Sequence, residues 1–96
     1  KAAAALQPAN PPVLDTLAWV YHARTEDKEA LTVYQRIPAS AISTLTGEIL
    51  YHWGVVAQEA GDADTARRQL QAAVGKNQDF PGIDDALSRL RGLTLR

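Results

Sequence analysis

The sequence contains no cysteine and no methionine, and it has only one phenylalanine. The lack of cysteine excludes disulfides, thiol nucleophiles and thiolate metal sites, although thiol-free domains occur in reducing and oxidising compartments alike. No apolar run approaches the roughly 20 residues that span a bilayer. Residues 2–6 are apolar but too short for a signal peptide. Because no initiator methionine is present, we expect the chain to be part of a longer protein.

Neither sign of charge dominates, since 10 Lys and Arg face 11 Asp and Glu, for a formal net charge of −1. Nucleic-acid binding needs a concentrated excess of basic residues, so this balance argues against it. The basic stretch near the end of the chain is expected to complement a helix dipole and stay solvated. Ninety-six residues suffice for one domain with a modest core.

Helical spacing predicts a first pair of helices over residues 10–38, whereas strand signals are nearly absent. Asn10 is suited to cap the first helix, whose first turn tolerates two prolines because its amide donors lack partners there. Inward positions follow at spacings of three and four: Leu14, Leu17, Ala18 and Tyr21. After a break at residues 25–27, the second helix places three residues inward: Ala30, Leu31 and Tyr34. Pro38 should end it near Ile37.

A second pair is predicted over residues 46–75, after a loop rich in Ser and Thr. The inward residues of its first helix are Ile49, Leu50, Trp53, Val56 and Ala57. Gly61 and Asp62 form a stop followed by a cap, and Gly75 ends the next helix. A last helix over residues 81–92 has apolar residues at helical spacing: Ile83, Ala86, Leu87 and Leu90. Helices of this length are marginal alone, so they must be stabilised by packing against neighbours.

The residue pattern of the second helix pair repeats that of the first. Leu14-x2-Leu17-Ala18-x2-Tyr21 precedes Ala30-x3-Tyr34, and Leu50-x2-Trp53-Gly54-x2-Ala57 precedes Ala66-x3-Leu70 at the same distance. Small residues are expected where the two helices of a pair approach most closely: Ala18, Ala30, Gly54 and Ala66. This pattern resembles the tetratricopeptide (TPR) motif, in which large, small and aromatic residues alternate on one helix and an alanine and an aromatic follow on its partner.

The resemblance implies an all-α fold, a TPR-like α-solenoid of antiparallel helix pairs with two full repeats and a C-terminal capping helix. The expected parts are the tail of a preceding repeat (1–9), two repeats (10–38 and 46–75) and the capping helix (81–92). A polar face on the last helix suits an end that meets water: Asp84, Asp85, Ser88, Arg89 and Arg91. The sequence departs from the family in its interval of 36 residues instead of 34, in Thr25 where a turn glycine is usual, and in Ala57 where an aromatic is usual.

Three segments carry a narrower resemblance: NPPVLDTLAWVY, EILYHWGVVAQEAGD and DFPGIDDALSRL. They are similar to the C-terminal repeats of bacterial TPR lipoproteins of exopolysaccharide and exosortase (PEP-CTERM) systems. That resemblance implies a periplasmic or outer-membrane-associated scaffold, held at the membrane only through an anchor outside this sequence. Without it, a cytoplasmic scaffold is the alternative.

The TPR resemblance also implies a function, namely protein–protein interaction, with a peptide or protein segment bound in a concave groove lined by the first helix of each pair. The predicted groove residues are Asp15, Thr16, Trp19, His22, Tyr51, His52, Val55, Gln58 and Glu59. Trp19 lies outside the packed positions of the motif, and an exposed tryptophan is a frequent binding hot spot. The structural alternative is that Trp19 packs on the adjacent helix or on an upstream repeat.

The sequence bears on two other functions, catalysis and self-association. No catalytic motif is present, and His22 and His52 lack further ligands at metal-binding spacing, so no enzyme activity, cofactor or metal is expected. A homo-oligomer is the alternative to the groove, because the N-terminal end should expose apolar surface that can pair with a copy of itself.

Overall fold

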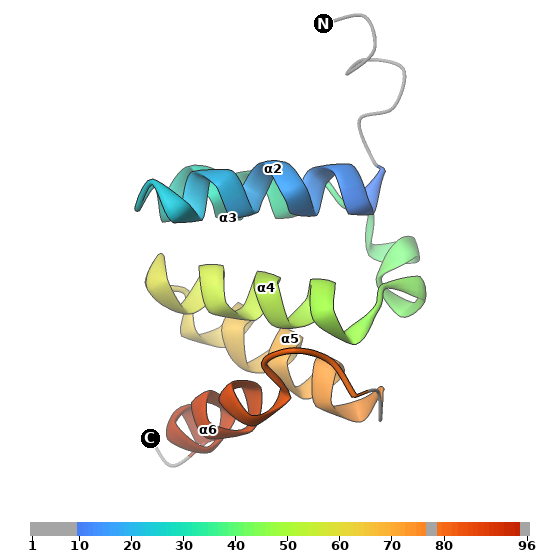
Figure 1. Cartoon of the computed structure of the whole chain (residues 1–96), viewed down its shortest axis with the longest axis vertical. Helices are drawn as coiled ribbons and strands as arrows, with labels where there is room; N and C mark the ends of the chain where they lie inside the picture. Colours follow the sequence, from blue (N-terminus) through green and yellow to red (C-terminus); the bar gives the residue numbers. More distant parts are fainter. Residues whose placement is uncertain (1–9, 77–78, 95–96) are drawn as a thin grey trace, which may run out of the picture.

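The computed structural model describes residues 10–76 and 79–94, and these residues form helices and no strands (Figure 1). The all-α class predicted from the helical spacing is therefore confirmed. The elements are α2 (Pro11–Ala23), α3 (Asp27–Tyr34), the 3₁₀ helix η1 (Ala39–Thr44), α4 (Gly47–Glu59), α5 (Ala63–Gly75) and α6 (Ile83–Thr94). The helix tail expected within residues 1–9 lies outside the described residues. In the described part of the chain, no helix has the length and apolar character needed to cross a membrane.

Side-chain caps start three of the helices. The Asn10 side chain accepts a hydrogen bond from the Val13 amide at 3.2 Å, and the prolines of α2 occupy its first two positions. Thr46 caps α4 through the Ile49 amide. Asp62 caps α5 in the same way. Each cap satisfies one of the amide donors that a helix leaves unpaired at its start, which fixes where the helix begins.

The α3 helix ends at Tyr34, earlier than the sequence suggests. The Gln35 amide still bonds four residues back, to Leu31, but the amides of Arg36 and Ile37 bond to carbonyls only three residues back, those of Val33 and Tyr34. Tightened turns of this kind precede Pro38, which disfavours α geometry in the residue before it. Where a Ser- and Thr-rich loop was expected, the chain instead forms η1.

Equivalent elements recur every 36 residues. The helices α2, α4 and α6 begin at residues 11, 47 and 83, and α3 and α5 begin at residues 27 and 63. Even the turns match, because Thr25 and Gly61 both have positive φ, 60° and 91°. Thr25 therefore takes the left-handed conformation that the usual glycine adopts more easily, at a cost of about 1–2 kcal/mol.

The interval of 36 residues aligns the last helix with α4, and three of its four expected apolar residues lie at the core, namely Ile83, Ala86 and Leu90. Ala86 corresponds to Leu50 in this register and is buried like it, with 0% exposure for both. The sequence pattern also suggested that Leu87 faces inward, yet Leu87 is 41% exposed. The face that packs on α5 and α4 instead carries Ile83, Ala86, Leu90 and Leu93, at spacings of three and four.

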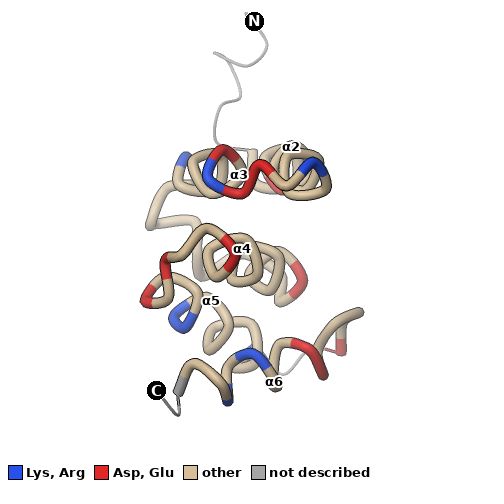
Figure 2. Tube along the Cα trace, turned by 90° about the vertical axis from the view of Figure 1, so that its left-hand side faces the viewer, with Lys and Arg blue, Asp and Glu red and all other residues tan. Residues whose placement is uncertain are grey.

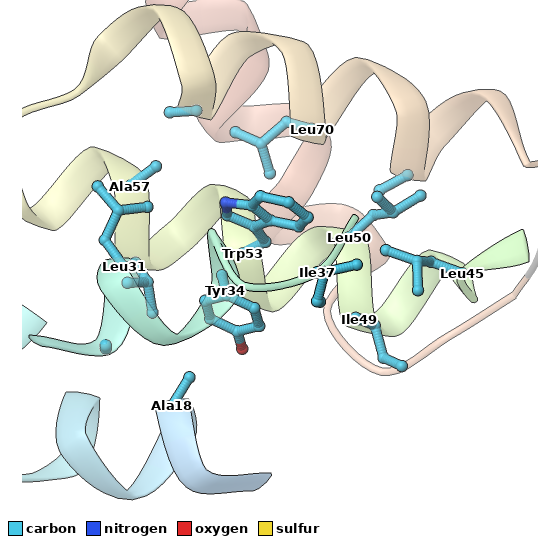
Figure 3. Packing of buried hydrophobic residues seen from close by; sticks show 14 of the residues in the cluster. Ala18, Leu31, Tyr34, Ile37, Leu45, Ile49, Leu50, Trp53, Ala57 and Leu70 are labelled. Carbon is cyan, nitrogen blue, oxygen red and sulfur yellow. The ribbon is translucent and has the colours of Figure 1, made fainter. Parts of the chain in front are cut away.

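The core runs through the stack of helices (Figure 3). The Tyr34 ring of α3 lies against the Trp53 ring of α4, with centroids 5.6 Å apart and planes only 10° apart. Leu70 of α5 lies on the other side of Trp53, and Ala18 of α2 lies beyond Tyr34 (Figure 3). The predicted core role of Trp53 is confirmed, since this side chain is buried in the cluster.

Gly54 shows why a small residue is needed where paired helices approach. A methyl group built on Gly54 would lie 2.6 Å from Cγ of Leu70, too close for any real contact. Side chains at the equivalent close approaches are also small and fully buried: Ala18, Ala30 and Ala66. The backbones of α4 and α5 can therefore come together only because the side chain at this position is a hydrogen atom.

The helices lie one above another along the long axis of the molecule, with α2 and α3 at one end and α6 at the other (Figure 1). Among the described elements, α4 contacts α2, α3, α5 and α6, whereas α2 contacts only α3 and α4. Acidic and basic residues lie side by side on α3, whereas α6 has its acidic residues at its start and its basic residues further along (Figure 2).

Candidate protein-binding cleft

A cleft of about 340 Å³ opens between α2 and α4. Its lining consists of Asp15, Thr16, Trp19, Val20, Ala23 and His52. Five of these residues follow one another along the α2 face at helical spacing, and His52 comes from the first turns of α4. The structure therefore brings together four of the nine predicted groove residues, Asp15, Thr16, Trp19 and His52, in one depression.

Trp19 forms one wall of the cleft and also joins the helix pair α2 and α3 to the helix pair α4 and α5. Its indole stacks on the His52 imidazole, with centroids 3.9 Å apart and planes 26° apart, and it lies tilted against His22 at 4.7 Å. The side chain is partly buried. Trp19 thus packs on the adjacent helix, as the structural alternative predicts, and still lines the cleft.

Asp15 anchors the polar side of the cleft. Its carboxylate accepts a hydrogen bond from the Tyr34 hydroxyl at 2.5 Å and lies 3.0 Å from Nδ1 of His52. Burial raises the pKa of Tyr34 above its ordinary value, and the hydrogen bond to Asp15 and the negative charge of that carboxylate raise it further. The buried phenol consequently stays neutral and remains a donor to Asp15.

His22 is held by a second carboxylate. Its Nδ1 lies 2.5 Å from Oδ1 of Asp27, and the two side chains are 27% and 18% exposed. Each histidine of the cleft region is therefore paired with one aspartate. No group of three or more His, Cys, Asp or Glu side chains in the described ranges is arranged to hold a metal ion.

The remaining groove residues on α4 meet the last helix instead of open space. The Tyr51 hydroxyl donates to Oδ2 of Asp85 at 2.7 Å, and Nη1 of Arg89 donates to Oε1 of Gln58 at 3.0 Å. Glu59 lies 3.6 Å from the same guanidinium and is 48% exposed. These three predicted groove residues therefore help to hold α6 against α4.

These contacts change the expected role of the polar face of α6. Asp85 and Arg89 were expected to be solvated, yet they bond to each other at 2.7 Å and to side chains of α4. The hydrogen bond from Tyr51, followed by that from Arg89, lowers the pKa of Asp85 below its ordinary value. Burial, the bond to Asp85 and the charge of Asp85 raise the pKa of Tyr51 to about 12.

Val55 differs most from the sequence-based expectation. Its side chain is only 4% exposed, so it presents almost no surface to a partner. The reason is that α4 is an inner helix, contacted from both sides of the stack, while the equivalent position of the edge helix α2 is Trp19. The accessible part of the predicted groove is consequently the part carried by α2.

Val20 also lines the cleft but was missed by the sequence interpretation. It is 51% exposed and belongs to a second apolar stripe of α2, at spacings of four and three, with Val13 and Leu17. Leu17 was expected to face inward and is 39% exposed. The spacing of this stripe is present in the sequence. It was overlooked because the apolar periodicity of the helix was assigned to the inward stripe of Leu14, Ala18 and Tyr21.

No protein-family model matches the chain, and no solved structure matches it.

Proposed function

We propose that the chain is a protein-binding module of a TPR-like helical-repeat scaffold, and that it holds an apolar segment of another protein in the cleft between α2 and α4. The repeat assignment is supported by helix starts spaced 36 residues apart and by the small residues at the helix crossings. A binding function is favoured over catalysis because the walls of the cleft are mostly apolar.

The observation that carries this proposal is the composition of the cleft lining. Among its residues only Asp15 and His52 are ionisable, and these two already interact with each other. Trp19, Val20 and Ala23 supply apolar surface around them. An apolar anchor side chain would therefore displace water without leaving a charge unpaired, whereas a charged anchor would have to compete with that internal pair.

The rim of the cleft can orient such a segment. Thr16 is exposed, and its hydroxyl donates to the carbonyl of Pro12, which leaves the oxygen able to accept from a partner backbone amide. Recognition then combines one buried anchor with a few polar contacts along α2, the arrangement used when short segments bind helical grooves.

The resemblance to bacterial TPR lipoproteins of exopolysaccharide and exosortase systems extends the proposal to a cellular location. In a bacterial exopolysaccharide or secretion assembly, the cleft would bind another component of that assembly in the periplasm or at the outer membrane. The full-length sequence provides the check, since an upstream signal peptide with a lipid-attachment cysteine supports this assignment and its absence supports a cytoplasmic scaffold.

The cleft itself is tested with Trp19→Ala. A partner recovered from the source cell by pull-down is titrated against the wild type and the variant by calorimetry, and loss of a hot-spot tryptophan is expected to weaken binding at least about 30-fold. Leu87→Ala is the matched control, because Leu87 is also an exposed apolar residue but lies on α6. Equal affinities for wild type and Trp19→Ala, with unchanged helical content, would overturn the assignment.

A further inference from the structure

A second cleft, of about 370 Å³, opens between the end of α3, the 3₁₀ helix η1 and the first half of α5. We call it the α3–α5 cleft, and it shares no lining residue with the cleft between α2 and α4. One face of α5 lines it with Thr65, Arg68 and Gln69, and the opposite wall includes Ile37 and Ile42. Its volume is within the range of roughly 300–1,000 Å³ that is usual for ligand pockets.

Two polar side chains that line the α3–α5 cleft are buried without a hydrogen-bond partner. Gln69 is 7% exposed, and its side-chain amide bonds to no other group in the described parts of the chain. Trp53 is 5% exposed, and its Nε1 is a buried donor that has no partner among the described residues either. Buried polar groups in folded proteins are nearly always hydrogen-bonded, because an unpaired one destabilises the fold. Two such groups beside one cleft point to a ligand there.

The packing of the helices does not require an amide at position 69. In the interval of 36 residues, Gln69 corresponds to Val33, which is 6% exposed and belongs to the core cluster. An aliphatic side chain therefore fills the equivalent position of the first helix pair. Gln69 places a polar group where an apolar one satisfies the packing, and departures of this kind are expected at functional sites.

The lining selects a ligand with one negative charge and an apolar body. Arg68 is the only ionisable side chain that lines the α3–α5 cleft. It donates to the Thr65 hydroxyl at 3.0 Å and forms no ion pair with a carboxylate within the described ranges. Ile37 and Ile42 supply aliphatic surface. One guanidinium matches the single charge and the planar oxygens of a carboxylate, whereas a phosphate dianion would bring a second charge that has no partner there.

We propose that the α3–α5 cleft binds a carboxylate carried on a branched aliphatic body. The carboxylate lies against Arg68, which is exposed at the rim, and accepts a hydrogen bond from the Gln69 amide. The aliphatic body lies against Ile37 and Ile42. Free branched-chain acids and peptide C-termini that end in leucine share this chemistry. Because such a ligand is small and Arg68 is exposed, the Kd is about 0.1–10 mM.

The indole N–H signal of Trp53 in the NMR spectrum of the ¹⁵N-labelled chain reports binding. The sequence has two tryptophans, so Trp19→Phe leaves Trp53 as the only indole. N-acetyl-leucine, titrated to about 50 mM, should shift this signal and the Gln69 side-chain signal to saturation. N-acetyl-leucinamide has the same shape without the charge and should bind at least about threefold more weakly. The absence of any shift, or equal affinity for acid and amide, would overturn the proposal.

Gln69→Met tests the buried side of the α3–α5 cleft. Methionine matches the length of glutamine and removes both hydrogen-bonding groups, so N-acetyl-leucine should bind at least about tenfold more weakly. The urea concentration at half-unfolding should stay the same or rise, because no hydrogen bond within the fold is lost. A lower midpoint would show that the Gln69 amide is bonded inside the fold. That result, or unchanged binding, would contradict the proposal.

Arg68→Met tests the charge, and Arg67→Met is the matched control. Arg67 is the preceding residue of α5, pairs with Asp64 at 3.0 Å and does not line the α3–α5 cleft. Arg68→Met should bind N-acetyl-leucine and its amide with equal affinity, because the partner of the carboxylate is gone. Arg67→Met should keep the preference for the acid. A preference for the acid that survives in Arg68→Met would overturn the role of Arg68.

A pentapeptide that ends in leucine distinguishes the two sources of the carboxylate. With a free C-terminus it should shift the same signals, since its last residue carries the chemistry of N-acetyl-leucine. Tighter binding of the peptide assigns the site to a chain terminus, and equal or weaker binding assigns it to a free acid. A pentapeptide amide should lose affinity as N-acetyl-leucinamide does.

Failure of this proposal is distinguishable from failure of the cleft between α2 and α4. Trp19 does not line the α3–α5 cleft, so N-acetyl-leucine should bind Trp19→Ala as it binds the wild type. Gln69 does not line the cleft between α2 and α4, so Gln69→Met should keep its affinity for the partner protein.

Discussion

The indole of Trp19 on α2 stacks on the imidazole of His52 on α4, with ring centroids 3.9 Å apart. His52 also lies 3.0 Å from the Asp15 carboxylate. The His52 side chain therefore makes two of the contacts that join α4 to α2. A stacked aromatic pair is worth about 0.5–1.5 kcal/mol. A hydrogen bond to a charged group adds a similar or larger amount.

His52→Ala is therefore expected to lower the free energy of unfolding by about 1–3 kcal/mol in urea denaturation. It should also shift tryptophan emission to longer wavelength, since Trp19 gains contact with water while Trp53 stays buried. Glu48→Ala, an exposed change on the same helix, is the control and should do neither. An unshifted emission spectrum for His52→Ala would show that the stacked pair does not form in solution.

The hydroxyl of Tyr34 carries a second testable contact. It donates to Asp15 at 2.5 Å from a ring that is fully buried, so Tyr34→Phe leaves the packing intact and removes only the bond. We expect a loss of about 1–3 kcal/mol in the free energy of unfolding, because the lost bond is to a charged acceptor.

The control for Tyr34→Phe is Tyr21→Phe. Tyr21 is partly buried on α2, and within the described residues its hydroxyl makes no hydrogen bond to a side chain or carbonyl. Removal of the Tyr21 hydroxyl should change the free energy of unfolding by less than about 0.5 kcal/mol. If both variants lost equal stability, the bond between Tyr34 and Asp15 would contribute nothing specific.

Helix positions were accessible to sequence reasoning because several boundaries have a local chemical cause. Asn10 and Asp62 cap helices through their own side chains, and Gly61 supplies the left-handed turn before α5. The 3₁₀ helix after Pro38 was not predicted, since Ser and Thr are compatible with many loop conformations. On α6, Ile83, Ala86 and Leu90 lie at the core as expected, but Leu87 is exposed, because several Leu spacings fit an amphipathic helix and only packing on α5 and α4 selects one.

The candidate site was harder to predict than the fold. Periodicity identifies which residues face away from a helix partner, and two of the residues it selected, Trp19 and His52, stack on each other in the structure. Periodicity carries no information on what else covers a face. Val55 is therefore buried although it repeats the position of Trp19, and Tyr51 is engaged by α6 although it repeats the position of Asp15.

Gly54→Ala tests the close crossing of α4 and α5. Alanine favours a helix over glycine by about 1 kcal/mol, so an unconstrained site would gain stability. Here the new methyl group would lie 2.6 Å from Cγ of Leu70, which is fully buried and cannot swing away. Overpacking of this kind costs about 1–3 kcal/mol, and we expect a net loss of about 1 kcal/mol or more in thermal or urea unfolding.

A matched substitution separates crowding from helix propensity. Gly75 ends α5, and a methyl group there meets no atom within 4 Å. Gly75→Ala should therefore leave stability unchanged or raise it slightly. A gain in stability for Gly54→Ala as well would mean that α4 and α5 lie farther apart in solution.

Acid should weaken the attachment of α6 through Asp85. Its pKa in the folded chain lies below the ordinary value of 3.8, owing first to the hydrogen bond from Tyr51 and then to that from Arg89. The stabilisation is thus fully present above about pH 4 and is lost as the pH falls through the lower folded value. The difference in unfolding free energy between wild type and Asp85→Ala should shrink as the pH falls from about 6 to about 2. A constant difference would show that Asp85 does not hold α6 through its charge.

Alkali should act on the other partner of the same bond. Tyr51 has its pKa raised from 10.0 to about 12 in the folded chain, mainly by burial and then by Asp85. Its stabilising contribution is present below pH 10 and declines between about pH 10 and pH 12, because the unfolded chain ionises first. Tyr51→Phe lacks this titration, so its unfolding free energy should approach that of the wild type over that range. Spectrophotometric titration of phenolate absorbance provides the direct measurement, and a Tyr51 that ionises near pH 10 would contradict its bond to Asp85.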